Sequence, residues 1–215
     1  MSSYSLSIVS KPVTDVSALV QVLNYLHPIS PEIAEYLSKH TSSILVRKKK
    51  LLLKPGMMCN HLYFIKKGAL RGFAKEDNKE ITTWITAENE MVTSIARLSK
   101  YQPSREYIQA IENSELLCMH LDDLENLYNA FPAFNIVGRK LLQTYYGHAE
   151  ERAFVARVTK AEDKYRYFIE NQQHLVNRIP LTYIASYLGI TLETLSKVRS
   201  RLAAKINVEN IQIIS

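Results

Sequence analysis

The chain has 215 residues, of which 47% are apolar and 22% are charged, with 6 glycines and 7 prolines. These proportions exclude disordered, collagen-like and mucin-like chains and favour a globular protein of one or two compact units, with two as our working count. The N-terminal sequence lacks a basic start followed by an apolar run, and no later run approaches the ~20 apolar residues of a membrane span. We therefore expect a cytoplasmic protein without a membrane partner.

Cysteine and histidine spacing argues against metal and redox chemistry. Cys59 and Cys118 form neither a CxxC motif nor a disulfide framework, so we expect both to be buried small side chains. The six histidines show no HxH or HExxH spacing. We predict no metal site, no cofactor and no catalytic residues.

The first half of the chain predicts short helices followed by a series of strands. The segment from Asp15 to His40 has apolar residues at helical spacing. From Ile44 on, short stretches rich in β-branched and aromatic residues alternate with turn formers, which predicts an antiparallel sandwich or roll. The strand-like stretches cover residues 43–53, 61–74, 80–86, 106–111 and 115–121.

A long helix is predicted from Ala133 to about Val158, because Pro132 suits a first helical turn and no further proline interrupts the stretch. It is too long for the roll to cover, so we expect it to pair with a second copy; an amphipathic helix lying on its own domain is the alternative. One heptad-like row comprises Phe134, Val137, Leu141, Thr144, His148, Glu151, Val155 and Val158. A second row, which would pack on the roll or on a partner, comprises Leu142, Tyr145, Ala149 and Ala153.

Three regions follow from this pattern. A Thr-x-x-Glu capping box at Thr159 predicts a new helix after a hinge. We divide the chain into a β-domain with N-terminal helices (1–131), a pairing helix (132–158) and a C-terminal domain (159–215). In these three regions Lys and Arg together number 15, 4 and 8, and Asp and Glu together number 14, 2 and 5. The basic surplus toward the C-terminus favours a polyanion partner there.

Residues 180–204 predict a helix, a tight turn and a second helix. Ala185 is small where the helices would cross, Gly189 can take a positive φ, and Thr191 can cap the second helix. Leu195, Val198 and Leu202 recur at spacings of three and four and form its buried stripe. Because the opposite face is polar, the pattern predicts a recognition helix for the major groove of DNA. An ordinary helical hairpin with a solvated charged face is the alternative.

The chemistry of that polar face suits DNA. Glu193 can accept a hydrogen bond from a cytosine amino group, and Lys197 can donate one to guanine. Other side chains would contact the phosphates, which position a protein without specifying a sequence. The expected backbone contacts are Thr191, Arg199, Ser200, Arg201 and Lys205.

Two segments resemble one family of proteins. The segment ASYLGITLETLSKVRSRL is similar to the helix-turn-helix of the cyclic-AMP receptor/Fnr (Crp/Fnr) family of bacterial transcription regulators, and LLLKPGMMCNHLYFIKKGALRGF resembles its β-roll. The resemblance covers about residues 30–204. It implies an α+β fold with an N-terminal antiparallel β-roll of the cyclic-nucleotide-binding type, a long dimerisation helix and a C-terminal helix-turn-helix with part of a two-stranded wing.

The same resemblance implies partners and contacts. The family forms homodimers that bind palindromic operators in double-stranded DNA, and RNA polymerase is an implied further partner. Its base-contacting positions fall on Leu192, Glu193, Ser196 and Lys197.

The effector cassette departs from the pattern of the family's cyclic-nucleotide binders. Thr93 and Ser94 stand where Gly-Glu would hold the ribose, and Ser104 and Arg105 stand where Arg-Ser would hold the phosphate. The carboxylate is missing, and a shift of one residue turns Arg105 away from the pocket. The resemblance therefore implies a degenerate pocket that is not built for cyclic AMP, and a different small-molecule effector stays open.

Two other classes of protein remain open alternatives. One is a β-roll ligand-binding or signalling protein that uses its C-terminal helices for protein contacts. The other is a small cupin-like enzyme, which would need a convergent metal or acid/base set that the sequence does not present. A transcription regulator accounts for the polar face of Glu193, Ser196 and Lys197 and is our leading hypothesis.

Overall fold

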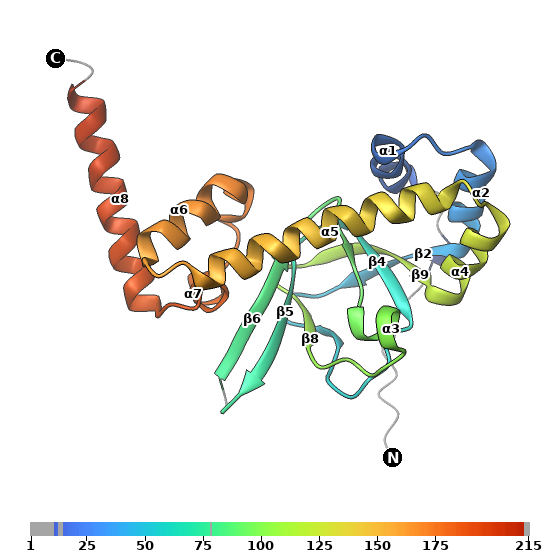
Figure 1. Cartoon of the computed structure of the whole chain (residues 1–215), viewed down its shortest axis with the longest axis horizontal. Helices are drawn as coiled ribbons and strands as arrows, with labels where there is room; N and C mark the ends of the chain where they lie inside the picture. The colour runs from blue at the N-terminus through green and yellow to red at the C-terminus, as the bar shows by residue number, and fades with distance from the viewer. Residues whose placement is uncertain (1–10, 13–14, 78, 213–215) are drawn as a thin grey trace. The chain divides into compact units, whose positions relative to one another are not determined.

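The computed structural model describes residues 11–12, 15–77 and 79–212, without the side chains of residues 11–12, 99–100 and 205–212 (Figure 1). Contacts divide the chain into two compact units. The first comprises Met1–Phe73 and Ile85–Tyr146, and the second comprises Ala74–Trp84 and Gly147–Ser215. The boundary between them falls inside the long helix α5 (Phe134–Arg157).

Two β-sheets form the predicted roll. Their strand orders are β1-β2-β9-β4-β7 and β3-β8-β5-β6. Central strand β9 pairs antiparallel with β2 on one side and with β4 on the other, where His61 lies opposite His120. The strands are β1 (Lys11–Pro12), β2 (Thr41–Val46), β3 (Leu51–Leu53), β4 (His61–Lys67), β5 (Leu70–Glu76), β6 (Lys79–Thr86), β7 (Met91–Val92), β8 (Tyr107–Ala110) and β9 (Ser114–His120). The antiparallel β-roll and the α+β class are confirmed.

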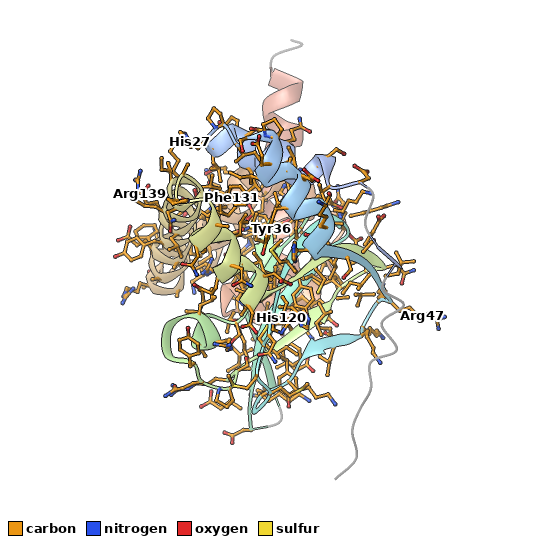
Figure 2. All side chains as sticks on the ribbon, turned by 90° about the vertical axis from the view of Figure 1, so that its right-hand side faces the viewer. His27, Tyr36, Arg47, His120, Phe131 and Arg139 are labelled. Atoms are coloured by element: carbon orange, nitrogen blue, oxygen red, sulfur yellow. The ribbon has the colours of Figure 1, made fainter. Side chains whose placement is uncertain are left out.

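Helices α1 (Ser17–Leu26), α2 (Pro31–His40) and α4 (Leu121–Ala130) gather at one end of the first unit (Figure 1). The helices predicted before His40 are therefore confirmed. The side chains of Tyr36 and Phe131 lie side by side at this end, with ring centroids 6.0 Å apart (Figure 2). The Tyr36 hydroxyl also donates to the Asp123 carbonyl at 3.0 Å, which joins α2 to α4.

The sequence interpretation did not include α4. Its first turn is capped by His120, whose Nδ1 accepts a hydrogen bond from the Asp122 amide at 3.2 Å. Leu121 and Leu127 are buried beneath it. Gly138 of α5 allows the two helices to approach closely, because a Cβ there would lie only 2.5 Å from the Tyr128 hydroxyl.

The second unit contains α6 (Ala161–Asn171), a 3₁₀ turn (Gln173–Leu175), α7 (Leu181–Leu188) and α8 (Leu192–Gln212). Residues 74–84, from β5 and β6, belong to this unit. Ser186 of α7 fixes them, because its hydroxyl donates to the Glu80 carbonyl at 2.8 Å and accepts from the Thr82 amide at 2.9 Å.

Two local predictions are wrong. The N-cap of α6 is Lys160 rather than Thr159, and no side chain caps the helix, so the Thr-x-x-Glu motif does not form a capping box. The expected beginning of a wing is also absent from the described residues, because α8 continues to Gln212. Residues 203–212 contain neither proline nor glycine, so nothing in the chain terminates the helix before that point.

Candidate nucleic-acid interface

The turn between α7 and α8 has the geometry that the sequence predicted. Gly189 takes a left-handed conformation with φ 64° and ψ 37°. The Gly189 amide donates to the Ser186 carbonyl at 3.2 Å, and the Ile190 amide donates to the Ala185 carbonyl at 3.0 Å. These bonds satisfy carbonyls at the end of α7 and turn the chain sharply toward α8.

Thr191 caps α8. Its hydroxyl oxygen accepts a hydrogen bond from the Thr194 amide at 3.1 Å and lies 2.8 Å from the Thr194 hydroxyl. An N-cap of this kind satisfies one of the free amides of the first helical turn. The start of α8 is therefore fixed relative to α7 by two local features, the glycine turn and the threonine cap.

A buried lysine also joins the helices of this unit. Lys164 of α6 is only 8% exposed, and its Nζ donates to the Leu188 carbonyl at 2.9 Å and to the Ala156 carbonyl at 3.5 Å. A positive charge is favourable at a helix C-terminus, where carbonyl dipoles point outward. The sequence interpretation missed this residue, because a lysine that directly follows Glu162 and Asp163 is expected to be solvent-exposed.

Helix α8 has one buried and one exposed face over its first three turns. Leu195 and Val198 are 0% and 4% exposed, and Leu202 is half-buried. The side chains predicted for the opposite face and its flanks are exposed: Glu193, Ser196, Lys197, Ser200 and Arg201. Leu192, at the start of the helix, is exposed as well. Such a helix is held to its support by its apolar back and offers its polar face to a partner.

On this face Lys197 Nζ lies 2.6 Å from Glu193 Oε1, an ion pair across one helical turn. The Ser196 hydroxyl donates to the Leu192 carbonyl at 2.9 Å, and the Ser200 hydroxyl donates to the Ser196 carbonyl at 3.1 Å. A hydroxyl that donates to its own helix still has oxygen lone pairs to accept a further hydrogen bond. The face therefore offers two cations, Lys197 and Arg201, one anion and two hydroxyl acceptors.

Two of the expected phosphate-contacting residues, Arg199 and Lys205, are not among the exposed side chains described on this face. Arg199 is half-buried and lies four residues after Leu195, which brings it to the flank of the buried stripe. The side chain of Lys205 lies outside the described residues.

Two of the four cassette residues use their hydroxyls within the first unit. The Thr93 hydroxyl donates to the His61 carbonyl at 2.9 Å, and the Ser104 hydroxyl donates to the Glu106 carbonyl at 2.9 Å. Ser94, only 2% exposed, precedes the short helix α3 (Ile95–Lys100). Arg105 is exposed, as expected from its shifted position.

The sequence interpretation overlooked a second arginine in the cassette. Arg97 of α3 stacks its guanidinium on Tyr101, with 4.5 Å between the guanidinium carbon and the ring centroid. Its Nε is buried and has no hydrogen-bond partner among the described residues. The signal was available, because Arg97 lies between the two halves of the cassette.

The long helix exposes a row that differs from the first predicted row and shares Leu142, Ala149 and Ala153 with the second. Phe134, Val137 and Val155 of the first predicted row are at most 4% exposed, so that row packs inward at both ends. In the second row the Tyr145 hydroxyl donates to Glu90 Oε2 at 2.9 Å and accepts from the Met91 amide at 2.6 Å. Seven exposed residues, the α5 row, recur at steps of four and three: Asn135, Arg139, Leu142, Tyr146, Ala149, Ala153 and Ala156.

Among the described residues, no group of three His, Cys, Asp or Glu side chains is placed to hold a metal ion. None of the described helices combines the length and the apolar character that a bilayer span needs.

Residues 44–131 match the family of cyclic nucleotide-binding domains. The chain is similar to the anaerobic regulatory protein of Pasteurella multocida, with 25% identity over 179 residues that cover 78% of this chain and 64% of that protein. The match thus spans less than two thirds of that relative's length.

Solved structures share the fold. FixK2 from Bradyrhizobium japonicum has a TM-score of 0.65 and 20% identity, over 77% of this chain and 85% of that chain. A variant of CooA from Carboxydothermus hydrogenoformans has a TM-score of 0.64 and 20% identity, over 89% of this chain and 86% of that chain. The fold is that of a cyclic-nucleotide-binding β-roll joined to a helical C-terminal region. The resemblance to Crp/Fnr regulators is thereby confirmed.

Proposed function

We propose that the chain is a DNA-binding transcription regulator that recognises a palindromic operator as a homodimer and does not respond to cyclic AMP. It has no enzymatic activity in this proposal, and its relatives are named as regulators. The proposal assigns residues 1–131 to an effector-type domain, 132–158 to dimerisation and 159–215 to DNA binding. It acts in the cytoplasm, with double-stranded DNA and RNA polymerase as partners.

One observation carries the proposal: α8 combines a buried stripe at Leu195 and Val198 with an exposed face of base-reading residue types. The glycine turn and the Thr191 cap hold its N-terminal turns on the outside of the unit. Those turns are the part of a recognition helix that enters the major groove. We assign base contacts to Leu192, Glu193, Ser196 and Lys197, and phosphate contacts to Thr191, Arg199, Ser200, Arg201 and Lys205.

The α5 row supports the dimer. Leu142 and Tyr146 are 63% and 68% exposed, although both are large apolar side chains. Toward the C-terminus of α5 the row continues with Ala149, Ala153 and Ala156, whose small side chains let two helices approach closely. Steps of four and three are those of a two-stranded coiled coil, so a second copy of the helix would cover the row along its length. Two identical chains related by a two-fold axis then require a palindromic operator.

Genomic footprinting of the full chain in its own cell tests DNA binding directly and reveals the half-sites. The informative variant replaces both Glu193 and Lys197 by Ala. Its matched control replaces Glu162 and Arg166 by Ala, because these residues form an equivalent ion pair across one turn of α6, at 3.2 Å. Both variants remove one positive and one negative charge.

We expect the wild type and the α6 variant to occupy the same palindromic sites and the α8 variant to lose them. Absence of site-specific occupancy by the wild type would contradict the proposal. Loss of the sites in the α6 variant alone would assign recognition to a different surface.

A further inference from the structure

Exposed apolar side chains gather around α3 in the first unit (Figure 1). Among the described residues twelve large apolar side chains are exposed, and five of them come from α3, from the residue that follows it and from the loop between β3 and β4. These five form the α3 patch: Met57, Met58, Ile95, Leu98 and Tyr101. An apolar patch of this kind on the surface of a chain marks an interaction site when polar residues border it.

Hydrogen bonds tie the loop to the segment that contains α3. Before the helix, Cys59 Sγ lies 3.7 Å from Thr93 Oγ1. After the helix, the Gly56 amide donates to the Ser104 carbonyl at 2.9 Å, and the Ser104 amide donates to the Met57 carbonyl at 2.9 Å. The two methionines lie between these bonds on the loop, and α3 lies between them on the other segment. The five side chains therefore belong to one surface with a fixed backbone.

The α3 patch is flat. Met57, Met58 and Leu98 are 43%, 40% and 41% exposed, so each keeps more than half of its surface packed against the protein. Methionine side chains are flexible and polarizable and adapt to apolar partners of different shape. The patch therefore suits the apolar side of a protein segment that lies along it.

Cations border the patch, and carboxylates are absent from both segments that form it. Residues 51–60 and 91–105 contain neither Asp nor Glu. Lys54 and Arg105 are exposed, and the guanidinium carbon of Arg97 lies 4.5 Å from the centroid of the Tyr101 ring. Stacking uses the face of a guanidinium, whereas a carboxylate binds to the N–H groups at its edge. The patch is thus apolar at its centre and cationic at its border.

We propose that the α3 patch binds an acidic, amphipathic segment of a partner protein, with the apolar side chains of that segment on Met57, Met58, Ile95 and Leu98 and its carboxylates on Arg97 and Arg105. The interaction needs neither α8 nor DNA, so its test does not depend on the proposed function.

Three other occupants fit the patch less well. A nucleic acid would pair its phosphates with the cations but leave the apolar centre uncovered. Two α3 patches from two copies of the chain would bring like charges together. A bilayer surface buries an apolar face to a depth of about 5–10 Å, which suits side chains that stand clear of the protein rather than a flat patch.

The experiment selects short peptides from a displayed random library on the full chain, with counter-selection on the variant Leu98→Ser/Arg105→Glu. The selected peptides are then titrated into the full chain labelled with ¹³C at the methionine methyl groups. We expect peptides that combine Asp or Glu with large apolar residues, and saturable shifts at Met57 and Met58. Met119 is the internal reference, because it is 5% exposed and lies outside the patch.

Two matched pairs of variants separate charge from apolar contact. Arg105→Glu should weaken peptide binding roughly ten-fold or more, because it places a carboxylate against the carboxylates of the peptide. Arg47→Glu makes the same change of charge at an exposed position outside the patch and should stay within about two-fold. Leu98→Ser should weaken binding, whereas Leu45→Ser should not, because Leu45 is 83% exposed and lies on β2.

Equal weakening by Arg105→Glu and Arg47→Glu would show that net charge alone attracts the peptides and would overturn the proposal. Selected peptides without carboxylates, or shifts that leave Met57 and Met58 unchanged, would overturn it as well. Vesicles of phosphatidylglycerol form the last arm. Broadening of the Met57 and Met58 signals by these vesicles, without binding of any selected peptide, would assign the patch to a membrane surface instead. If Leu98→Ser does not fold, the comparison of the two arginine variants decides the same point.

Discussion

Lys197 Nζ and Glu193 Oε1 are 2.6 Å apart on the exposed face of α8, so the two side chains assigned to base reading form an ion pair with each other in the free protein. The two side chains are 63% and 76% exposed. An exposed pair of this kind contributes little to stability, so the cost of separating it on DNA is small. The ion pair keeps the carboxylate of Glu193 and the ammonium group of Lys197 on the same face of α8 in the free protein. On DNA, we expect each group to exchange its ion-pair partner for a base edge.

We predict different effects for two substitutions on this face. Glu193→Ala should relax preference at one operator position, with a change of ~1–3 kcal/mol in discrimination, because it removes a base contact. Arg201→Ala should weaken binding to all sequences and reduce the salt dependence, because we assign it to a phosphate. Selection from randomised DNA at two salt concentrations measures both effects. Equal loss for operator and random DNA in Glu193→Ala, with altered base preference in Arg201→Ala, would reverse the assigned roles.

The α5 row makes a prediction about the dimer. Leu142→Glu puts an uncompensated carboxylate into the proposed interface, which should weaken dimerisation by about 3 kcal/mol or more. Thr144→Glu is the matched control, since Thr144 is also exposed but lies on the first row that the sequence singled out. Sedimentation of the full chain should show dissociation for Leu142→Glu only. Dissociation of Thr144→Glu instead would mean that the first of the two predicted rows forms the interface.

Much of this architecture was predictable because local signals determine it. The bounds of α5, Phe134–Arg157, lie within one residue of the prediction, since a proline starts the stretch and no other interrupts it. Gly189 and Thr191 likewise act through bonds to their own neighbours. The parts that failed depend on tertiary context. Spacing placed Leu142, Ala149 and Ala153 in one row. Whether that row packs on the roll or is exposed depends on tertiary contacts, which spacing alone does not encode.

Helix α4, the burial of Lys164 and the absence of a Thr159 cap were not predicted from the sequence, because each depends on more than a local sequence pattern. Helix α4 follows β9 directly, and its cap is a histidine, which is not among the preferred capping residues. Lys164 is buried only because the Leu188 and Ala156 carbonyls are brought to it by the fold. Thr159 failed as a cap although its sequence fits, because the helix begins one residue later, after Lys160.

The degenerate cassette predicts no response to cyclic nucleotides. Thr93 and Ser104 use their hydroxyls within the protein, and Arg105 is exposed. Titration calorimetry with cyclic AMP and cyclic GMP should show no binding in the low micromolar range, about −8 kcal/mol. A measured affinity in that range would contradict the prediction, and Arg97→Gln would then show whether Arg97 supplies the missing cationic contact.

His61 predicts a pH dependence of stability. Burial, and then the neighbouring His120, hold the pKa of His61 below its usual value of 6.5 in the folded protein. The unfolded chain therefore binds a proton first as the pH falls through about 6.5, and stability is lost on the acid side of that value. His61→Gln should reduce this slope in denaturant titrations between pH 7 and 5. A slope in His61→Gln equal to that of the wild type would contradict the assignment.

Lys164 should contribute more to the stability of the second unit than any exposed lysine. Lys164→Met keeps the aliphatic stem but removes the ammonium group, which leaves the Leu188 carbonyl without its 2.9 Å partner at the end of α7. Removing a charged hydrogen-bond donor from a buried acceptor costs about 1–3 kcal/mol. Lys160→Met is the control, because Lys160 is exposed and its side chain does not cap α6. Denaturant unfolding of both variants measures the difference, and hydrogen exchange at the Gly189 and Ile190 amides reports whether the turn before α8 loosens. If both variants unfold at the same denaturant concentration as the wild type, Lys164 does not hold the turn, and the fixed position of α8 must come from Gly189 and Thr191 alone.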